Sequence, residues 1–144
     1  MLVSISYTGW QYARSVQLRS NCQHLANARH MSTSEALLST LAERPIDLAV
    51  MDVSFISQTL ILPEIAALLP PSGQLLSLVK PQFELDPGAL DKRGVVREPR
   101  RYAEVEQKIR TACEQCGLVI SHWQESPITG SDGNREFLLL ASKP

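Results

Sequence analysis

The 144-residue sequence contains no apolar run long enough to span a membrane. Its first residues, MLVSISYTGWQ, lack the charged leader, long apolar core and small-residue cleavage site of a signal peptide. An excess of basic charge is also absent, because 14 Lys and Arg residues face 15 Asp and Glu residues and the net charge is −1. This balance excludes a protein that holds nucleic acid by bulk charge alone. We therefore expect a cytoplasmic protein without membrane contact, in which any RNA contact comes from a local patch.

Cysteine is scarce and lacks the spacing of a metal site. The three residues are Cys22, Cys113 and Cys116. The pair in CEQC has no second pair, which a zinc ribbon would require, and it ends a predicted helix where a redox pair would begin one. We therefore expect reduced core cysteines and no metal site.

Apolar runs that fit strands alternate with segments of helical spacing, and the length suffices for one domain with a core. The clearest helix, 98–117, has Pro99 at its start and Gly117 at its end. Strands are predicted at 2–6, 46–54, 74–79, 118–127 and 134–142, helices at 10–18, 31–44, 55–70 (bent or restarted at Pro63) and 98–117, a strand or turn at 22–26, and a loop at 81–97. This alternation predicts an α/β fold with a mostly parallel sheet, helices on both faces and an antiparallel final pair of strands.

Three charged residues fall where the predicted strands would share one edge of the sheet. Asp52 and Lys80 end two parallel strands that we expect to be buried on both faces, and Glu136 begins the last, antiparallel strand. Ligands of open α/β sheets bind at this edge, and a lysine after a core strand is costly unless it is paired or solvated. Each residue also has a structural interpretation: Asp52 as a turn cap, Lys80 as a solvated charge, and Glu136 as a surface pair with Arg135.

The segments DLAVMDVSFIS, SLVKPQFE and SPITGSDGNREFLL carry a family resemblance. They resemble, in order and over 46–142, the haemolysin-A (TlyA) branch of the FtsJ-like ribose 2′-O-methyltransferases. The resemblance implies a Rossmann-like methyltransferase sheet, S-adenosylmethionine as cofactor, and ribosomal RNA or a ribosomal subunit as partner. It implies catalytic roles for Asp52, Lys80 and Glu136 in a lysine–aspartate–lysine–glutamate tetrad, with Lys80 activating the ribose hydroxyl, and cofactor contacts for Asp52 and Val53.

Parts of the family pattern are not recognisable in this sequence. They are the first tetrad lysine, the glycine-rich turn after the first strand that holds the cofactor, and an N-terminal RNA-binding module of S4 type. We therefore expect one N-terminally truncated domain over 1–144, divergent over 1–45, with cofactor binding weakened or lost and activity impaired. Residues 1–30 are expected to fill the place of the first strand beside 46–52, to pack loosely, or to leave an exposed edge that pairs with another copy.

A basic cluster lies on the predicted loop and helix start beside this edge. It could bind RNA phosphates or form a solvated helix end, and it consists of Lys92, Arg93, Arg97, Arg100 and Arg101. The sequence thus leaves open a methyltransferase, a non-catalytic remnant that binds RNA or a partner, and a haemolysin. The haemolysin is disfavoured because no segment is amphipathic and cationic enough to attack a membrane.

Overall fold

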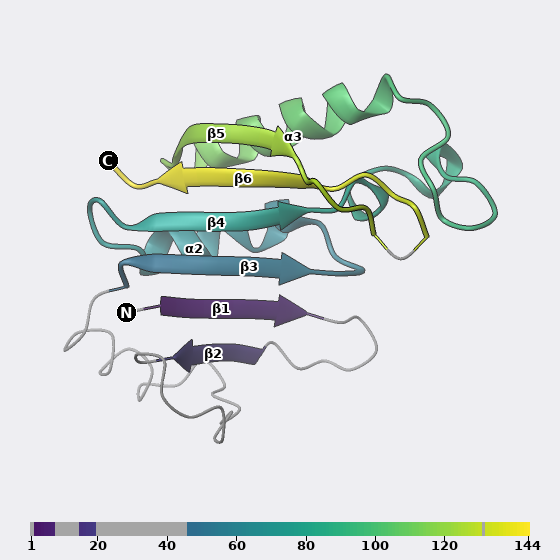
Figure 1. Ribbon diagram of the computed structural model, residues 1–144. Helices are drawn as coiled ribbons and strands as arrows, with labels where there is room; N and C mark the ends of the chain where they lie inside the picture. The colour runs from purple at the N-terminus through teal and green to yellow at the C-terminus, as the bar shows by residue number, and fades with distance from the viewer. Residues whose placement is uncertain (1, 8–14, 20–45, 131) are drawn as a thin grey trace.

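A computed structural model describes residues 2–7, 15–19, 46–130 and 132–144 of the chain. These residues form one six-stranded mixed sheet in the order β2-β1-β3-β4-β6-β5 (Figure 1). The strands are β1 (Leu2–Tyr7), β2 (Ser15–Arg19), β3 (Leu48–Val53), β4 (Gln74–Val79), β5 (Val119–Glu125) and β6 (Phe137–Ser142). The central strands β1, β3 and β4 are parallel, and the predicted antiparallel pairing of the last two strands is confirmed.

The N-terminal strands extend the sheet beyond β3. Strand β1 pairs with β3 along its whole length, from Leu2 opposite Leu48 to Tyr7 opposite Val53. Residues 2–7 therefore fill the place beside β3, and that edge offers no pairing site to another copy. The helix predicted at 10–18 is wrong for residues 15–18, which belong to β2; the alternation of Val16 and Leu18 with polar residues is typical of a strand. The elements predicted at 22–26 and 31–44 lie outside the described residues.

Two α-helices, α2 (Leu62–Leu68) and α3 (Arg101–Gln115), lie against the same face of the sheet (Figure 1). Their apolar stripes meet alternate residues of β3, β4 and β6 in one core. Strand β4 was predicted to be buried on both faces, which is wrong: Leu75 and Val79 are buried, whereas Leu76 is 36% exposed. The three short 3-10 helices are η1 (Gln58–Leu60), η2 (Pro81–Phe83) and η3 (Pro87–Ala89).

The helix ends follow local sequence rules. The predicted helix 55–70 is not continuous: Phe55 has a positive φ of 63°, residues 58–60 form a 3-10 turn, and α2 starts at Leu62 with Pro63 in its first turn, which agrees with the predicted restart at Pro63. Helix α3 ends before Gly117, whose φ of 77° suits glycine at this position. Cys113 is fully buried in the core, and this burial raises its pKa to about 12, while burial also raises the pKa of Cys116. Neither thiol is activated, as expected of core cysteines.

Candidate active site

Asp52 and Lys80 form an ion pair at the carboxyl ends of β3 and β4. The distance from Lys80 Nζ to Asp52 Oδ1 is 2.6 Å, and Lys80 Nζ also donates a hydrogen bond to Ser54 Oγ at 3.2 Å. The Lys80 side chain is 15% exposed, so its charge is compensated by these two contacts more than by water. The interpretation of Lys80 as a solvated surface charge is therefore wrong.

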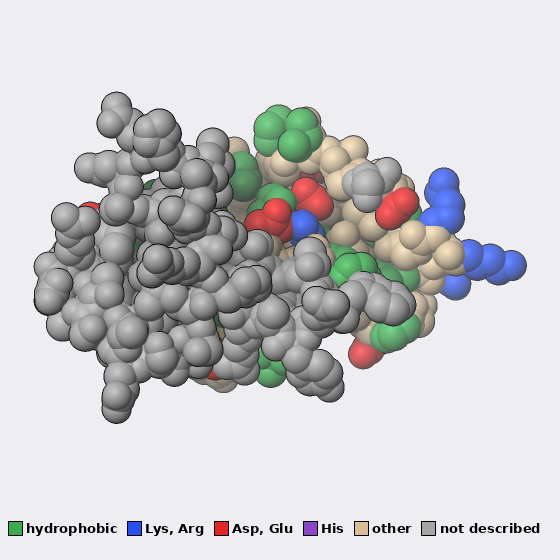
Figure 2. Space-filling view, turned by 90° about the horizontal axis from the view of Figure 1, so that it is seen from below, with side chains coloured by type: hydrophobic (Ala, Val, Ile, Leu, Met, Phe, Trp, Pro, Cys, Tyr) green, Lys and Arg blue, Asp and Glu red, His purple; other side chains and the backbone are tan. Residues whose placement is uncertain are grey.

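A rim pocket of about 550 Å³ opens beside this pair. Its walls come from the segments after β3 and β4, from the 90–94 loop and from the turn before β6. Lys80 and Glu136 both line it, and Phe55, Phe83 and Arg93 form part of its wall. In the space-filling view, acidic side chains flank a basic one in a hollow of the surface (Figure 2). Val53, in contrast, is buried in the core, so only its backbone could reach a ligand there.

Glu136 is held in the rim pocket as a buried carboxylate, only 7% exposed. The structure does not pair it with Arg135, which instead forms an ion pair with Glu125 and lies over the Tyr102 ring. Burial raises the pKa of Glu136; the Lys80 ammonium opposes this effect and the Asp52 carboxylate adds to it. Because Lys80 contacts Asp52 and lines the same pocket as Glu136, the three charged groups lie in one neighbourhood, and their catalytic roles stay a prediction.

The raised pKa of Glu136 has a consequence for stability. A carboxyl whose pKa is higher in the folded state favours folding most at low pH, and this contribution is lost as the pH rises through the folded-state value. We therefore expect Glu136→Gln to be more resistant to urea than the wild type at neutral pH. The two proteins should converge below the ordinary pKa of 4.5, where both side chains are neutral. Urea unfolding across this pH range measures the difference, and a glutamine variant that is less stable at neutral pH would contradict the assignment.

The turn before β6 is shaped around the Glu136 carboxylate. A Cβ atom on Gly130 would lie 2.9 Å from Glu136 Oε1, closer than side chains normally approach. Asn134, buried at 3% exposure, ties this turn to the neighbouring loop. Its Oδ1 accepts a hydrogen bond from the Val96 backbone N–H at 3.2 Å, and its Nδ2 donates to the Gly94 carbonyl at 2.9 Å. The turn and the loop thus form one wall of the rim pocket.

A buried glutamate holds the segments after β3 and β4 together. The Glu84 side chain is 1% exposed and accepts hydrogen bonds from Ser57 Oγ at 2.6 Å and from the Gln58 backbone N–H at 2.7 Å. Lys108 of α3 completes the set, with Nζ 3.1 Å from Glu84 Oε2 and 2.7 Å from the Glu84 carbonyl oxygen. We call Ser57, Glu84 and Lys108 the Glu84 clamp. It crosslinks the chain shortly after Asp52 to the chain shortly after Lys80.

Sequence reasoning missed the residues that shape and support the pair. Glu84 stands in the quoted segment SLVKPQFE, but nothing in its spacing distinguishes a buried acid from an exposed one. Phe55 is 63% exposed beside the pair, and its ring centroid lies 4.8 Å from that of Phe83. Its positive φ is costly for a residue other than glycine, and such strain is typical of functional turns. Asn134, in GSDGN, could have been flagged only as a turn former.

The predicted basic cluster does not form one uniform patch. Arg93 lines the rim pocket and lies 3.6 Å from Asp91, whereas Arg100 and Arg101 are paired with Glu98 and Glu104 at 2.6 and 3.3 Å. Lys92 and Arg97 are exposed on the same loop. Basic side chains project from the right-hand end of the described surface in Figure 2. Only Arg93 combines high exposure, 78% of its side chain, with a place beside the pair.

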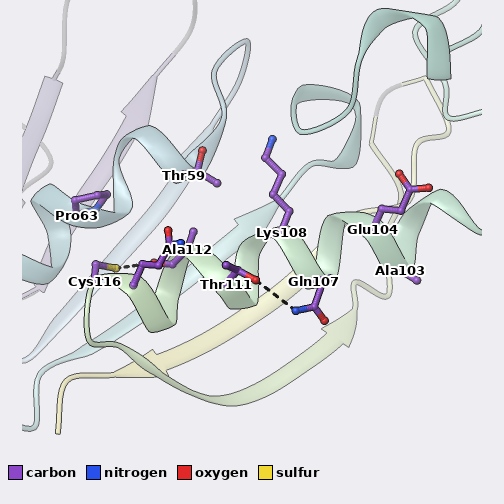
Figure 3. A pocket seen from close by; sticks show the side chains of 10 residues that line it. Thr59, Pro63, Ala103, Glu104, Gln107, Lys108, Thr111, Ala112 and Cys116 are labelled. Carbon is purple, nitrogen blue, oxygen red and sulfur yellow. Dashed lines mark hydrogen bonds between the residues drawn. The ribbon is translucent and has the colours of Figure 1, made fainter.

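A larger hollow of about 810 Å³ lies between α3 and the η1–α2 segment (Figure 3). Thr59 and Pro63 face Ala112 and Cys116 of α3 across it, so its floor is mainly apolar. It contains no convergent group of charged side chains like that in the rim pocket, and we therefore place the candidate active site at the rim. In the described ranges, no group of His, Cys, Asp and Glu residues is arranged to hold a metal ion. No helix of these ranges has the length and apolarity to cross a bilayer.

The sheet and the rim pocket define an α/β protein with a pocket at the carboxyl ends of its parallel strands, the edge where open sheets of this class bind ligands. The chain belongs to the FtsJ-like methyltransferase family, whose sequence profile matches residues 5–143.

Several known proteins are similar to this chain. The Bacillus subtilis protein named "Putative rRNA methyltransferase YqxC" is 44% identical over 93 residues, which are 65% of this chain and 33% of that protein. The Mycobacterium tuberculosis 16S/23S rRNA (cytidine-2′-O)-methyltransferase TlyA is 33% identical over 65% of this chain and 35% of its own length. The structure described as "Putative hemolysin from Streptococcus thermophilus" superposes with a TM-score of 0.68 and 37% identity, covering 73% of this chain and 38% of that one. The chain therefore spans about a third of the length of these curated relatives.

Proposed function

We propose that this chain transfers a methyl group from S-adenosylmethionine to a ribose 2′-hydroxyl of ribosomal RNA. The observation that carries the proposal is the 2.6 Å contact between Lys80 and Asp52, made beside a pocket that Lys80 and Glu136 both line. Family membership supports the reaction class, and the names of the relatives support the RNA substrate. We keep a cytoplasmic location as a prediction.

The rim pocket fits the chemistry of this methyl donor. When bound, the donor supplies an electrophilic methyl group on a cationic sulfonium. The pocket offers the buried carboxylate of Glu136 and the neighbouring carboxylate of Asp52, whose negative charge raises the pKa of Glu136. The negative charge of these carboxylates also attracts a nearby cation, such as the sulfonium of the donor. Asp52 and the backbone of Val53 are the residues we propose to hold it. The sequence predicts that this chain alone binds the donor weakly or not at all. Calorimetric titration with S-adenosylmethionine tests this prediction.

The ion pair provides a route for the proton of the ribose hydroxyl. Lys80 Nζ can accept that proton only after it has released one of its own, and Asp52 Oδ1, 2.6 Å away, is in position to receive it. Ser54 Oγ fixes the direction of the amine from a second side. The amine is thereby held toward the pocket. Holding the hydroxyl oxygen in line with the methyl group supplies much of the rate of methyl transfer.

A tritium-transfer assay tests the proposal. The 144-residue chain is incubated with ribosomal subunits or purified ribosomal RNA and methyl-labelled S-adenosylmethionine, and label in the RNA is counted. We expect incorporation by the wild type at a slow rate and none with RNA that is already fully methylated at the target ribose. RNA binding without incorporation would instead support the non-catalytic alternative.

Replacing Gly130 should disturb the position of the Glu136 carboxylate without disturbing the fold. The backbone of Gly130 is not in the left-handed region, so alanine is allowed there, but its Cβ would lie 2.9 Å from Glu136 Oε1. We expect Gly130→Ala to lower the transfer rate by about ten- to a hundredfold, because small misplacements of reacting groups are costly. Stability should change by less than about 1 kcal/mol.

Gly88→Ala is the matched control for Gly130→Ala. A Cβ on Gly88 would meet nothing within 4 Å, and this loop residue does not line the pocket. Its transfer rate should equal that of the wild type. Equal rates for both alanine variants would show that the Glu136 carboxylate does not need its present position.

Arg93 should contribute to RNA binding more than Arg100 does. Arg93 lies on the wall of the rim pocket with its guanidinium 3.6 Å from Asp91, whereas Arg100 is neutralised by Glu98 at 2.6 Å. We expect Arg93→Ala to reduce the slope of log affinity against log salt by about 1, the value for one lost phosphate contact. Arg100→Ala, at the same end of the molecule, should leave the slope nearly unchanged. Fluorescence anisotropy over a salt series measures both slopes, and identical slopes in all three proteins would contradict the placement.

A further inference from the structure

Gln58 is a glutamine buried in the core, and both polar atoms of its side chain are bonded to β4. The residue is 1% exposed. Its Nε2 donates a hydrogen bond to the Leu78 carbonyl oxygen at 2.6 Å, and its Oε1 accepts one from Ser77 Oγ, itself fully buried, at 2.8 Å. A buried amide is costly unless its polar atoms are bonded, and an apolar side chain of similar length would fill the space without that requirement. The amide therefore indicates a role beyond filling the core.

Gln58 holds the chain on both sides of Lys80. Leu78, which the Gln58 side chain contacts, lies two residues before Lys80. The Gln58 backbone N–H donates a hydrogen bond of 2.7 Å to Oε1 of Glu84, four residues after Lys80. Between these two points, the Lys80 carbonyl oxygen accepts a hydrogen bond from the Phe83 N–H at 3.0 Å. The backbone that carries Lys80 is therefore fixed both before and after this residue.

Gln58 itself lies on the segment that supplies the partners of Lys80. It begins η1, shortly after Asp52 and Ser54, whose side chains Lys80 Nζ contacts. The paired residues of the parallel ladder between β3 and β4 end with Asp52 opposite Leu78. Lys80 lies beyond this last pair, so the ladder between the two strands does not reach it. The hydrogen bonds of Gln58 continue the link between the two segments where the ladder ends.

We infer that Gln58 is a positioning residue that sets the place of the Lys80 ammonium relative to the Asp52 carboxylate. This inference rests on the proposed function and adds to it a residue that contacts neither the RNA nor the methyl donor, because it is buried in the core. Without the amide, the Lys80 backbone can shift and the 2.6 Å contact with Asp52 is misaligned. Small displacements of reacting groups slow a reaction strongly, whereas the surface that binds the substrates stays the same. The expected signature is a lower kcat at an unchanged KM.

Steady-state tritium transfer measures this signature in Gln58→Met, which keeps the approximate length of the side chain and removes the amide. We expect kcat to fall about tenfold, with the KM values for ribosomal RNA and S-adenosylmethionine within about twofold of the wild type. Ser77→Ala is a milder second variant, because it removes only the donor to Gln58 Oε1 and keeps the bond to Leu78. Its kcat should fall about threefold. Ser77→Ala decides the outcome if Gln58→Met does not fold.

Acetylation of Lys80 provides a readout that does not depend on activity. The folded chain is treated with limiting acetic anhydride, and peptide mass spectrometry gives the rate of acetylation of Lys80 relative to that of the exposed Lys92. In the wild type the Lys80 side chain is 15% exposed and held by Asp52, so the ratio should be low. We expect both variants to raise the ratio, and Gln58→Met to raise it at least about threefold, because local opening exposes the amine.

Ile109→Val is the control, because Ile109 is fully buried in the same core and its side chain has no polar atom that could link the two segments. It should loosen the core but keep the kcat and the acetylation ratio of the wild type. An unchanged kcat or an unchanged acetylation ratio in the folded variants would overturn the role of Gln58 and leave the proposed function standing. An equal loss of kcat in Ile109→Val would overturn it as well. Absence of transfer by the wild type would overturn the proposed function, and the acetylation ratio would still decide whether Gln58 holds Lys80 in place.

Discussion

Replacing Lys80 with methionine should reduce methyl transfer by at least about a thousandfold, within the range attributed to a positioned acid–base group. Methionine keeps the length of the side chain but can neither accept the hydroxyl proton nor pair with Asp52 at the rim. Because Asp52 is 55% exposed, its carboxylate can be hydrated after the change, and the fold should tolerate the variant. Tritium transfer to ribosomal RNA measures the rate, and circular dichroism establishes that the variant is folded.

Two further lysine variants make this test specific. Lys80→Arg keeps the charge and the pairing with Asp52 but cannot act as a base at neutral pH, so we expect it to be nearly as inactive as Lys80→Met. Lys143→Met removes a lysine at the far end of β6, where Nζ donates to the carbonyl oxygens of Ala66 and Leu69. It should keep full activity. Substantial transfer by Lys80→Arg would assign Lys80 a purely electrostatic role.

Removing the Glu84 carboxylate should produce the largest loss of stability among the polar variants considered. Glu84→Ala leaves the buried Gln58 N–H without an acceptor and breaks the contacts to Ser57 and Lys108. Breaking a fully buried pair costs about 3–5 kcal/mol, but the Lys108 side chain is 42% exposed and water can solvate its freed charge. We therefore expect a loss of about 2–3 kcal/mol in the free energy of unfolding, measured by urea denaturation.

Glu106→Ala provides the comparison for Glu84→Ala. Glu106 pairs with Arg110 at 2.6 Å on the surface of the same helix that supplies Lys108, with 35% of its side chain exposed. Ion pairs of this kind contribute about 0.3–0.5 kcal/mol. If both alanine variants lost the same small amount, the Glu84 clamp would not hold the two rim segments together.

The strands and helix with strong local signals could be predicted from the sequence. Strand β4 has the predicted bounds, 74–79, and β3 lies within two residues of the predicted range 46–54, since continuous apolar runs between turn residues leave few alternatives. Helix α3 follows from its apolar stripe and from Gly117, whose positive φ ends it. The proximity of Asp52 and Lys80 followed from topology, because parallel neighbouring strands end at the same edge.

Other features depend on contacts that the local sequence does not encode. Residues of strand β2 were predicted as part of a helix. Five residues of alternating polarity form a strand only when a neighbouring strand pairs with them, and β1 provides this pairing. The burial of Glu84 depends on α3, which follows it in sequence and brings Lys108 to the carboxylate. The strained turn at Phe55 and the hydrogen bonds of Gln58 to β4 are likewise visible only once the segments after β3 and β4 are assembled.

In the proposed reaction, the methyl acceptor is a ribose 2′-hydroxyl that is activated beside Lys80 and Asp52. The direct measurement is mass spectrometry of the nucleosides released from ribosomal RNA after incubation with the chain and S-adenosylmethionine. We predict a 2′-O-methylated nucleoside, with the methyl group retained on the ribose fragment, produced by the wild type and not by Lys80→Met. A methyl group on a base fragment, or equal products from the wild type and Lys80→Met, would contradict the account.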